Sequence, residues 1–115
     1  MSKDDRLEII KRNLIESKNI LNALCDENRQ RILLVLLENC SAGGIMVNDI
    51  ANKVNLSRPA VSHHLKMLLE NDIVSVKHIG TKNYYHITGT DKILSLKTLL
   101  LNIELYVDER NSEIK

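Results

Sequence analysis

The sequence lacks the features of a membrane protein, a disulfide-rich scaffold and an enzyme. No stretch approaches the roughly 18 consecutive apolar residues of a membrane-spanning helix, and the charged segment 1–12 is not followed by an apolar run of signal-peptide length. The two cysteines, Cys25 and Cys40, are too few for a disulfide framework. There is no glycine-rich phosphate loop, no metal-ligand cluster and no nucleophile placed beside a base by motif. We therefore expect a cytoplasmic protein that is not an enzyme.

The length and composition suit one small domain. The chain has 115 residues, 43% of them hydrophobic, which is enough for a core but not for an extensive one. Internal repeats and low-complexity segments are absent. We expect residues 1–115 to form a single domain that a partner subunit completes.

The net charge of +1 hides an uneven distribution along the chain. Residues 1–52 carry seven Lys and Arg against eight Asp and Glu, a net charge of −1, and residues 87–115 carry four against five, again −1. Residues 53–86 carry five basic side chains against two acidic ones, a net charge of +3, and contain all four histidines. Charge of one sign in one region predicts a basic face for an anionic partner, although chance clustering is an alternative.

Hydrophobic periodicity predicts helices in the first part of the chain. Apolar residues at three- and four-residue steps indicate a first helix from about Asp5 to Ala23, with Leu7, Ile10, Leu14, Leu21 and Leu24 on its apolar side. Asp26 is a suitable N-cap for a second helix, whose expected buried side is Ile32, Leu33, Leu36 and Leu37. The loop Cys40–Gly44 ends that helix.

Two short helical segments follow, joined by a tight connection. The segment MVNDIANKV has a helical pattern and is followed by the two residues Asn55 and Leu56. Ser57 is a good N-cap, and Pro59 falls in the first turn of the next helix, where its missing amide hydrogen costs nothing. That helix is expected to end near Asn71. Residues 47–71 thus predict a helix-turn-helix.

The period then changes from helical to two residues. The segments IVSVKHI and NYYHI, separated by GTK, predict a β-hairpin over about 73–87. Two strands alone are marginally stable, so the hairpin has to pack on the helices. A last helix is expected over about 91–108, starting at Asp91. Its apolar side is wider than one small domain can cover, which predicts a partner surface.

These elements predict a mainly α protein with a small β-hairpin wing, a winged helix-turn-helix of order α-α-α-α-β-β-α. At about 100° per residue, Val61, Leu65 and Leu68 share one side of the second helix of the motif and belong to its core. The shared core is expected to contain Ile50, Val54, Leu56, Val61, Leu65 and Leu68, with the small Ala51 where the two helices cross. The opposite side presents Pro59, Ser62, His63 and Lys66, as a helix entering the major groove of DNA requires.

The adjacent histidines point about 100° apart, so they cannot clasp one metal ion together. His63 faces outward and is expected to meet a phosphate or a base edge, the alternative being a solvated surface side chain. His64 lies at the border of the core and is expected to be a packed, hydrogen-bonded residue, the alternative being a contact with a base.

Basic side chains around this helix complete the predicted interface. Arg58 is long enough to reach a guanine or a phosphate, whereas Lys66 is expected to contact phosphate or to remain solvated. Thr81 and Lys82, at the hairpin tip, are placed to touch the backbone across the adjacent minor groove. Tyr84 and Tyr85 alternate faces, so one should pack and one be exposed. The candidate DNA contacts are Ser57, Arg58, Pro59, Ser62, His63, Lys66, Thr81 and Lys82.

The runs ALCDENRQRILLVLLE and NDIANKVNLSRPAVSHHLKMLLENDIVSVKHIGTKNYYHI resemble the ArsR/SmtB (arsenic-repressor) family of bacterial metal and stress sensors. The resemblance covers nearly the whole chain. It implies a homodimeric repressor that binds a double-stranded DNA operator and is released from it by an inducer. It also implies a dimer interface between the first and last helices, here Leu7, Leu14, Ile93, Leu96, Leu100, Ile103 and Val107.

The chain departs from the family at its sensing sites. Many members carry Cys-x-Cys-Asp before the recognition helix, where this sequence has Met46, Val47, Asn48 and Asp49. Others use Asp-x-His at the start of the last helix, with further ligands about three turns on. Here Asp91 and Glu104 remain, but Ile93 replaces the imidazole, and two carboxylates alone hold a zinc-like ion poorly. We therefore predict no metal cofactor at these sites.

The cysteines are the remaining candidates for an inducer response. Cys25 and Cys40 bracket the second helix, about 20 Å apart if it is intact, whereas a disulfide needs Cα atoms within about 7 Å. An intermolecular bridge, a thiol modification or metal ligation with the other subunit stays open. The alternative is that Cys25 is a small buried hydrophobe and Cys40 an incidental loop thiol.

The predicted function is a sequence-specific, DNA-binding transcriptional regulator. The alternative is a winged-helix module that binds protein. The outward residues of the recognition helix are polar and basic rather than aromatic, and this composition favours DNA.

Overall fold

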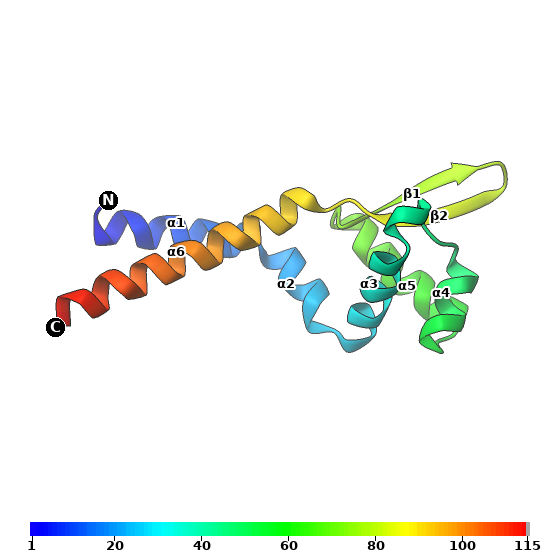
Figure 1. The fold of residues 1–115 in the computed structure, drawn as a ribbon, viewed down its shortest axis with the longest axis horizontal. Helices are drawn as coiled ribbons and strands as arrows, with labels where there is room; N and C mark the ends of the chain where they lie inside the picture. Colours follow the sequence, from blue (N-terminus) through cyan, green and yellow to red (C-terminus); the bar gives the residue numbers. More distant parts are fainter. Residues whose placement is uncertain (115) are drawn as a thin grey trace.

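The structure is a computed structural model that describes residues 1–114. In chain order its elements are α1 (Lys3–Glu16), α2 (Lys18–Cys25), α3 (Glu27–Glu38), the short 3-10 helix η1 (Cys40–Ala42), α4 (Val47–Val54), α5 (Arg58–Glu70), β1 (Val74–Ile79), β2 (Lys82–Ile87) and α6 (Thr90–Ile114). Figure 1 shows α3, α4, α5 and the hairpin gathered at one end of an elongated molecule, from which α1 and α6 project together. The predicted fold, mainly helical with a two-stranded wing, is confirmed.

The predicted first helix is in fact two helices, and the predicted element order therefore lacks one helix. α1 ends at Glu16, Ser17 is fully buried, and α2 begins at Lys18. The two halves pack on different partners, α1 on α6 and α2 on α3, and this difference separates the two helices at Ser17. The bend turns Asn13 and Ser17 inward and leaves Leu14 46% exposed, which a single straight helix does not predict.

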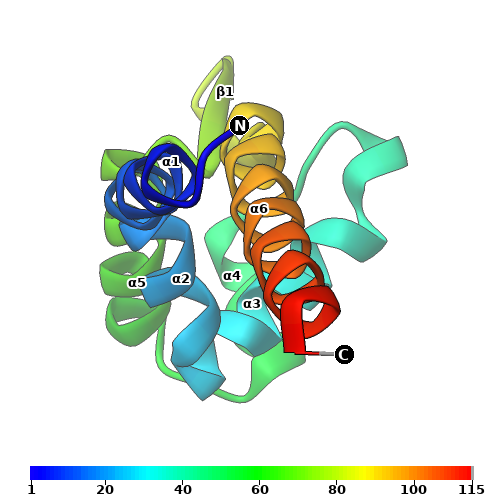
Figure 2. The same cartoon turned by 90° about the vertical axis from the view of Figure 1, so that its left-hand side faces the viewer.

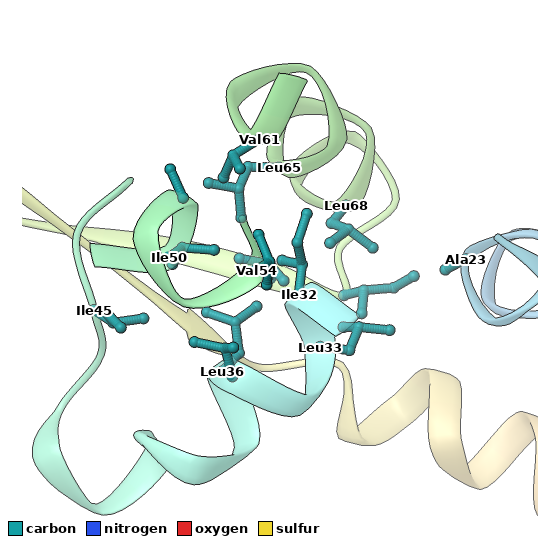
Figure 3. Packing of buried hydrophobic residues seen from close by; sticks show 14 of the residues in the cluster. Ala23, Ile32, Leu33, Leu36, Ile45, Ile50, Val54, Val61, Leu65 and Leu68 are labelled. Atoms are coloured by element: carbon teal, nitrogen blue, oxygen red, sulfur yellow. The ribbon is translucent and has the colours of Figure 1, made fainter. Parts of the chain in front are cut away.

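One hydrophobic core holds the helix-turn-helix together. Side chains from α3, α4 and α5 meet at its centre, where Figure 3 shows Ile32, Ile50, Val54, Val61 and Leu65 close together. All six residues predicted for the shared core either lie in it or, in the case of Leu56, pack against it. Ile32, Leu33 and Leu36 of α3 are buried as predicted. Leu37 is not: it is 53% exposed, and Val35 takes its place in the core.

The hairpin is antiparallel and packs on the core through one face. Cross-strand partners include Val74 with Ile87 and Val76 with Tyr85, and two backbone hydrogen bonds join Tyr85 to Ile45 in the loop after η1. Gly80 opens the two-residue turn with φ of 62°, a conformation that glycine adopts without strain. These contacts fix the wing relative to α3 and α4.

α1 and α6 lie side by side, as the end-on view in Figure 2 shows. A polar chain joins them: Arg6 Nη2 lies 3.0 Å from Glu109 Oε1, Arg6 Nη1 donates to Asn102 Oδ1, and Asn102 Nδ2 donates to the buried Asn13. α6 extends to Ile114, beyond the predicted end near residue 108. Within residues 1–114, no helix has the length and apolar character needed to cross a membrane.

Candidate nucleic-acid interface

A three-residue connection, Asn55 to Ser57, orients the two helices of the motif. Asn55 follows α4 with φ of 55° and ψ of 46°, the left-handed conformation that asparagine tolerates better than most residues. The amide of Leu56 then bonds back to the carbonyl of Ala51, which is small and buried where the helices approach. The chain thus turns sharply enough for α5 to cross α4.

Local capping starts α5 at the predicted residue. Ser57 Oγ accepts a hydrogen bond of 3.2 Å from the amide of Ala60, and Pro59 occupies the first turn. Val61, Leu65 and Leu68 are at most 1% exposed, which fixes the buried side of the helix. The helix ends at Glu70, with Asn71 as its C-cap, in agreement with the predicted end near Asn71.

All eight candidate DNA contacts are exposed. Ser57, Arg58 and Pro59 lie at the start of α5, Ser62, His63 and Lys66 follow on its outward side, and Thr81 and Lys82 are at the tip of the wing. Lys66 Nζ lies 4.0 Å from Glu70 Oε1 in an exposed ion pair, which contributes little to stability and leaves the ammonium free to meet an anion.

The two histidines differ as predicted in burial. His63 is exposed, whereas His64 is half-buried, and their ring centres lie 5.8 Å apart with planes inclined by 60°. Burial lowers the pKa of His64, the carboxylate of Asp26 opposes that shift, and the charges of Arg29 and His63 reinforce it. The prediction that His64 is hydrogen-bonded is wrong for its Nδ1 atom, which is buried and has no hydrogen-bond partner among residues 1–114.

Two arginines of α3, to which the sequence analysis gave no role, hold the motif in place. Arg31 donates from Nη2 to the carbonyl of Val54 at the end of α4. Arg29 donates from Nη2 to the carbonyl of Asn22 in α2, at 3.1 Å, and its Nη1 lies 3.7 Å from Met67 Sδ in α5. Both are positioning residues, and no local sequence pattern predicts such contacts between elements.

The N-terminus of α3 is capped as the sequence predicts. Asp26 Oδ1 accepts a hydrogen bond of 2.9 Å from the amide of Arg29. This bond lowers the pKa of the Asp26 carboxyl, with a further contribution from the Arg29 charge against the opposing effect of burial. The cap therefore carries its charge at neutral pH.

A hollow of about 160 Å³ lies between the starts of α4 and α5 and the tip of the wing. Its lining residues are Met46, Val47, Asn48, Arg58, Thr81, Lys82 and Asn83. The structure therefore brings together Arg58, Thr81 and Lys82, three of the predicted contacts. Asn48 and Asn83 were missed, because the sequence does not show that the first turn of α4 lies beside the wing.

The two tyrosines of β2 are both half-buried. Tyr85 packs against the core, and Tyr84, opposite Lys77, lies on the other face of the hairpin. The prediction that one tyrosine packs is confirmed for Tyr85, while full exposure of the other is wrong.

The residues at the family's metal positions do not fit a metal ion. Met46 is the N-cap of α4, Asn48 is exposed in its first turn, and Ile93 is an exposed aliphatic side chain on α6. Within residues 1–114, no three His, Cys, Asp or Glu side chains are grouped so that they could hold an ion. Neither thiolate nor imidazole is available at these positions, so they lack the ligands that a zinc-like ion prefers.

Both cysteines are free and exposed. Cys25 is the last residue of α2 and Cys40 the first of η1, so they bracket the intact helix α3 as predicted. The alternative that Cys25 is a buried hydrophobe is wrong, because the end of α2 turns its side chain to the surface.

The residues predicted for a dimer interface lie on α1 and α6, the two helices that project from the motif. Leu7 and Leu96 are half-buried within the chain. The others are 37% to 58% exposed: Leu14, Ile93, Leu100, Ile103 and Val107. Leu94, Leu101 and Leu105 are exposed on a second line of α6.

Comparisons with known proteins agree with this geometry. The profile of the family described as "Bacterial regulatory protein, arsR family" matches residues 26–76, which contain α3, α4 and α5. The transcriptional repressor SdpR of Bacillus subtilis is 33% identical over 72 residues, covering 63% of this chain and 76% of SdpR. The arsenical resistance operon repressor of Staphylococcus aureus is also 33% identical over 72 residues, which cover 65% of its own length.

Solved structures extend the similarity to the flanking helices. An ArsR-like transcriptional regulator from a Rhodococcus species superposes with a TM-score of 0.73 at 26% sequence identity. The match covers 88% of each chain.

Proposed function

The chain belongs to the arsR family of bacterial regulatory proteins, a family of transcriptional regulators, and on this premise we propose that it is a dimeric repressor of the cytoplasm that binds a specific DNA operator. The observation that carries the proposal is the outward side of α5. It is exposed, polar and basic, and the cationic tip of the wing lies beside it. A helix in the major groove with a wing at the adjacent minor groove uses these two surfaces.

In this proposal the residues have separate roles. Ser62 and His63, in the middle of the exposed side of α5, meet base edges, where hydrogen-bonding side chains distinguish base pairs. Lys66 contacts phosphate and sets the position of the helix without reading sequence. Ser57 and Pro59 fix the start of α5, which in this proposal lies close to the DNA backbone.

Dimerisation is proposed through α1 and α6. The exposed apolar residues of these helices form a surface that one chain leaves uncovered, and the symmetric pairing of two copies covers it. A dimer presents two copies of α5 about one DNA turn apart and therefore predicts a near-palindromic operator.

The proposed inducer response involves the exposed thiols. Cys25 and Cys40 lie at the two ends of α3, whose arginines hold α4 and α5, so modification there acts on the helix that supports the motif. Replacing each cysteine with serine should abolish release from DNA by an oxidant. Unchanged release in both variants would remove the thiols as sensors.

Binding to the duplex upstream of the chain's own gene tests the main proposal. We expect the purified, reduced protein to prefer this duplex over a scrambled one at fixed salt. His63→Ala should reduce that preference, whereas Lys66→Ala should weaken binding to both duplexes alike. Equal binding of the unaltered protein to both would contradict the proposal and assign the outward side of α5 to a protein partner.

A further inference from the structure

The hollow between α4, α5 and the wing has the electrostatics of an anion site. Of its seven lining residues, Arg58 and Lys82 are positive and none is negative. Neither cation belongs to any ion pair found among residues 1–114, which involve Arg6, Lys11, Arg29, Lys66 and Arg110 instead. Two cations that converge on one hollow without a carboxylate to neutralise them attract an anionic group.

Neutral donors surround the same space. Asn48, Thr81 and Asn83 place amide and hydroxyl groups in the lining. Met46 caps α4 without a side-chain hydrogen bond, so the first amides of that helix have no side-chain acceptor. The hollow therefore offers both charge and hydrogen-bond donors from three elements that are distant in sequence.

The geometry of winged-helix binding places DNA backbone at this point. If α5 lies in a major groove and the wing reaches the adjacent minor groove, the strand that separates the two grooves has to pass between them. The space between the start of α5 and the wing tip is the hollow that Arg58 lines from α5 and Lys82 from the wing.

We propose that the hollow is a seat for one phosphate diester of the DNA backbone, held jointly by Arg58 from α5 and Lys82 from the wing. This inference rests on the proposed function and deepens it, because it assigns Arg58 to the backbone and not to a guanine. The role of Arg58 is then to set the register between helix and wing, while sequence is read further along α5.

Alanine variants provide the first test, on both the upstream duplex and a random-sequence duplex of equal length. Arg58→Ala and Lys82→Ala should each lower affinity about ten-fold on both duplexes, because each removes a charge-assisted hydrogen bond to phosphate. The dependence of log K on log salt should become shallower by up to about 0.9 for each bound protomer. Both side chains are exposed, so the variants should keep the melting temperature of the unaltered protein.

Lys77→Ala is the matched control on the wing. Lys77 is exposed on β1 but does not line the hollow, so its loss should change affinity by no more than about two-fold. Equal losses of DNA affinity in the Lys77 and Lys82 variants would show that both lysines act only through the general positive potential of the wing, and would refute the phosphate site. A loss confined to the upstream duplex in Arg58→Ala would make Arg58 a base contact and overturn it as well.

The decisive test replaces the charged phosphates of the DNA backbone, position by position, with neutral linkages. Methylphosphonate linkages, placed in turn as symmetry-related pairs so that each protomer of the dimer meets one, should reveal a position at which the unaltered protein loses at least about ten-fold in affinity. At that position both Arg58→Ala and Lys82→Ala should show little further loss, since the contact is already gone. Different sensitive positions for the two variants, or none, would refute a shared phosphate.

A free phosphate ion is the other ligand that could occupy the hollow in place of a DNA phosphate. Inorganic phosphate should release DNA no better than chloride at equal ionic strength, and stronger release would assign the hollow to the free anion. The affinity losses and salt dependence of the alanine variants are measured on the random duplex as well, so they do not depend on sequence preference. Equal affinity of the unaltered protein for upstream and random duplexes would defeat the proposed operator function, while the Arg58→Ala and Lys82→Ala variants, compared with Lys77→Ala, would still decide the phosphate seat.

Discussion

Replacing Leu100 with glutamate should separate the proposed dimer into monomers. Leu100 lies on α6 on the same side as Ile93 and Val107, seven residues away in each direction, and is 58% exposed in the single chain. Full burial of a leucine side chain stabilises by about 1.5 to 3 kcal/mol, so covering the exposed part contributes about 1 to 1.7 kcal/mol per copy. A symmetric interface contains two copies, and their loss raises the dimer dissociation constant by about 30- to 300-fold.

This magnitude is a lower bound, because the glutamate also brings a carboxylate into an apolar contact. Sedimentation equilibrium over a range of concentrations measures the change directly. DNA binding by the same variant should weaken too, since a monomer engages one half-site instead of two.

The matched control places the same side chain elsewhere on the helix. Lys97 is exposed and lies with Glu104 and Asp108 on a charged line of α6, where Lys97→Glu should leave the dimer intact. A dimer that persists in Leu100→Glu would refute the placement of the interface. Equal dissociation in both variants would instead show that charge on α6, and not loss of apolar contact, drives the effect.

Three further predictions concern the stability of the motif. Leu65→Ala, at a site 1% exposed, should lower the free energy of unfolding by about 2 to 5 kcal/mol in urea titrations, and a loss no larger than that of Lys66→Ala would contradict the assigned core. Burial lowers the pKa of His64, so the unfolded chain binds a proton more readily and the free energy of unfolding should fall as the pH drops through 6.5. His64→Gln should remove this part of the pH dependence, and an unchanged slope of stability against pH in that variant would refute the assignment to His64. Gly44→Ala should lower the thermal midpoint more than Gly43→Ala, because a Cβ at Gly44 would lie 2.8 Å from the carbonyl oxygen of Tyr85 whereas one at Gly43 meets nothing within 4 Å; equal shifts would leave backbone strain as the sole cause.

The helix-turn-helix was predictable because its signals are local and agree with one another. Ser57 caps the helix that follows it, Pro59 sits in the first turn, and Val61 and Leu65 recur at helical spacing. Each residue reports on neighbours within one or two turns, so a single sequence contains the whole argument.

The break at Ser17 was not predictable in the same way. The apolar spacing on either side of it continues as if one helix ran through, and the decisive fact is that α1 and α2 pack on different elements. The polar chain from Arg6 through Asn102 to Asn13 has the same origin, since its members are about ninety residues apart in sequence. Burial of these polar groups becomes favourable only when both helices are present to satisfy them.

The hollow at the wing also depends on arrangement and not on pattern. Arg58 and Lys82 were predicted separately, one for the recognition helix and one for the wing, with no sign that they share a space. The backbone bonds between Ile45 and Tyr85 hold the wing against the loop before α4, where the hollow forms. The sequence therefore predicted Arg58, Thr81 and Lys82 but not Asn48 and Asn83, and the fold supplied their relation.

α3 contacts elements at both ends of the molecule. On one side it packs on α2, and on the other it contacts α4 and β2. Arg29 joins α2 to α5 in a single side chain, and Arg31 holds the end of α4. Changes at α2 therefore reach α4 and α5 through the side chains of these two arginines. In a protein that carries neither of the family's usual metal-ligand motifs, an inducer is therefore best sought among molecules that react or bind at the ends of α3, where both thiols are exposed.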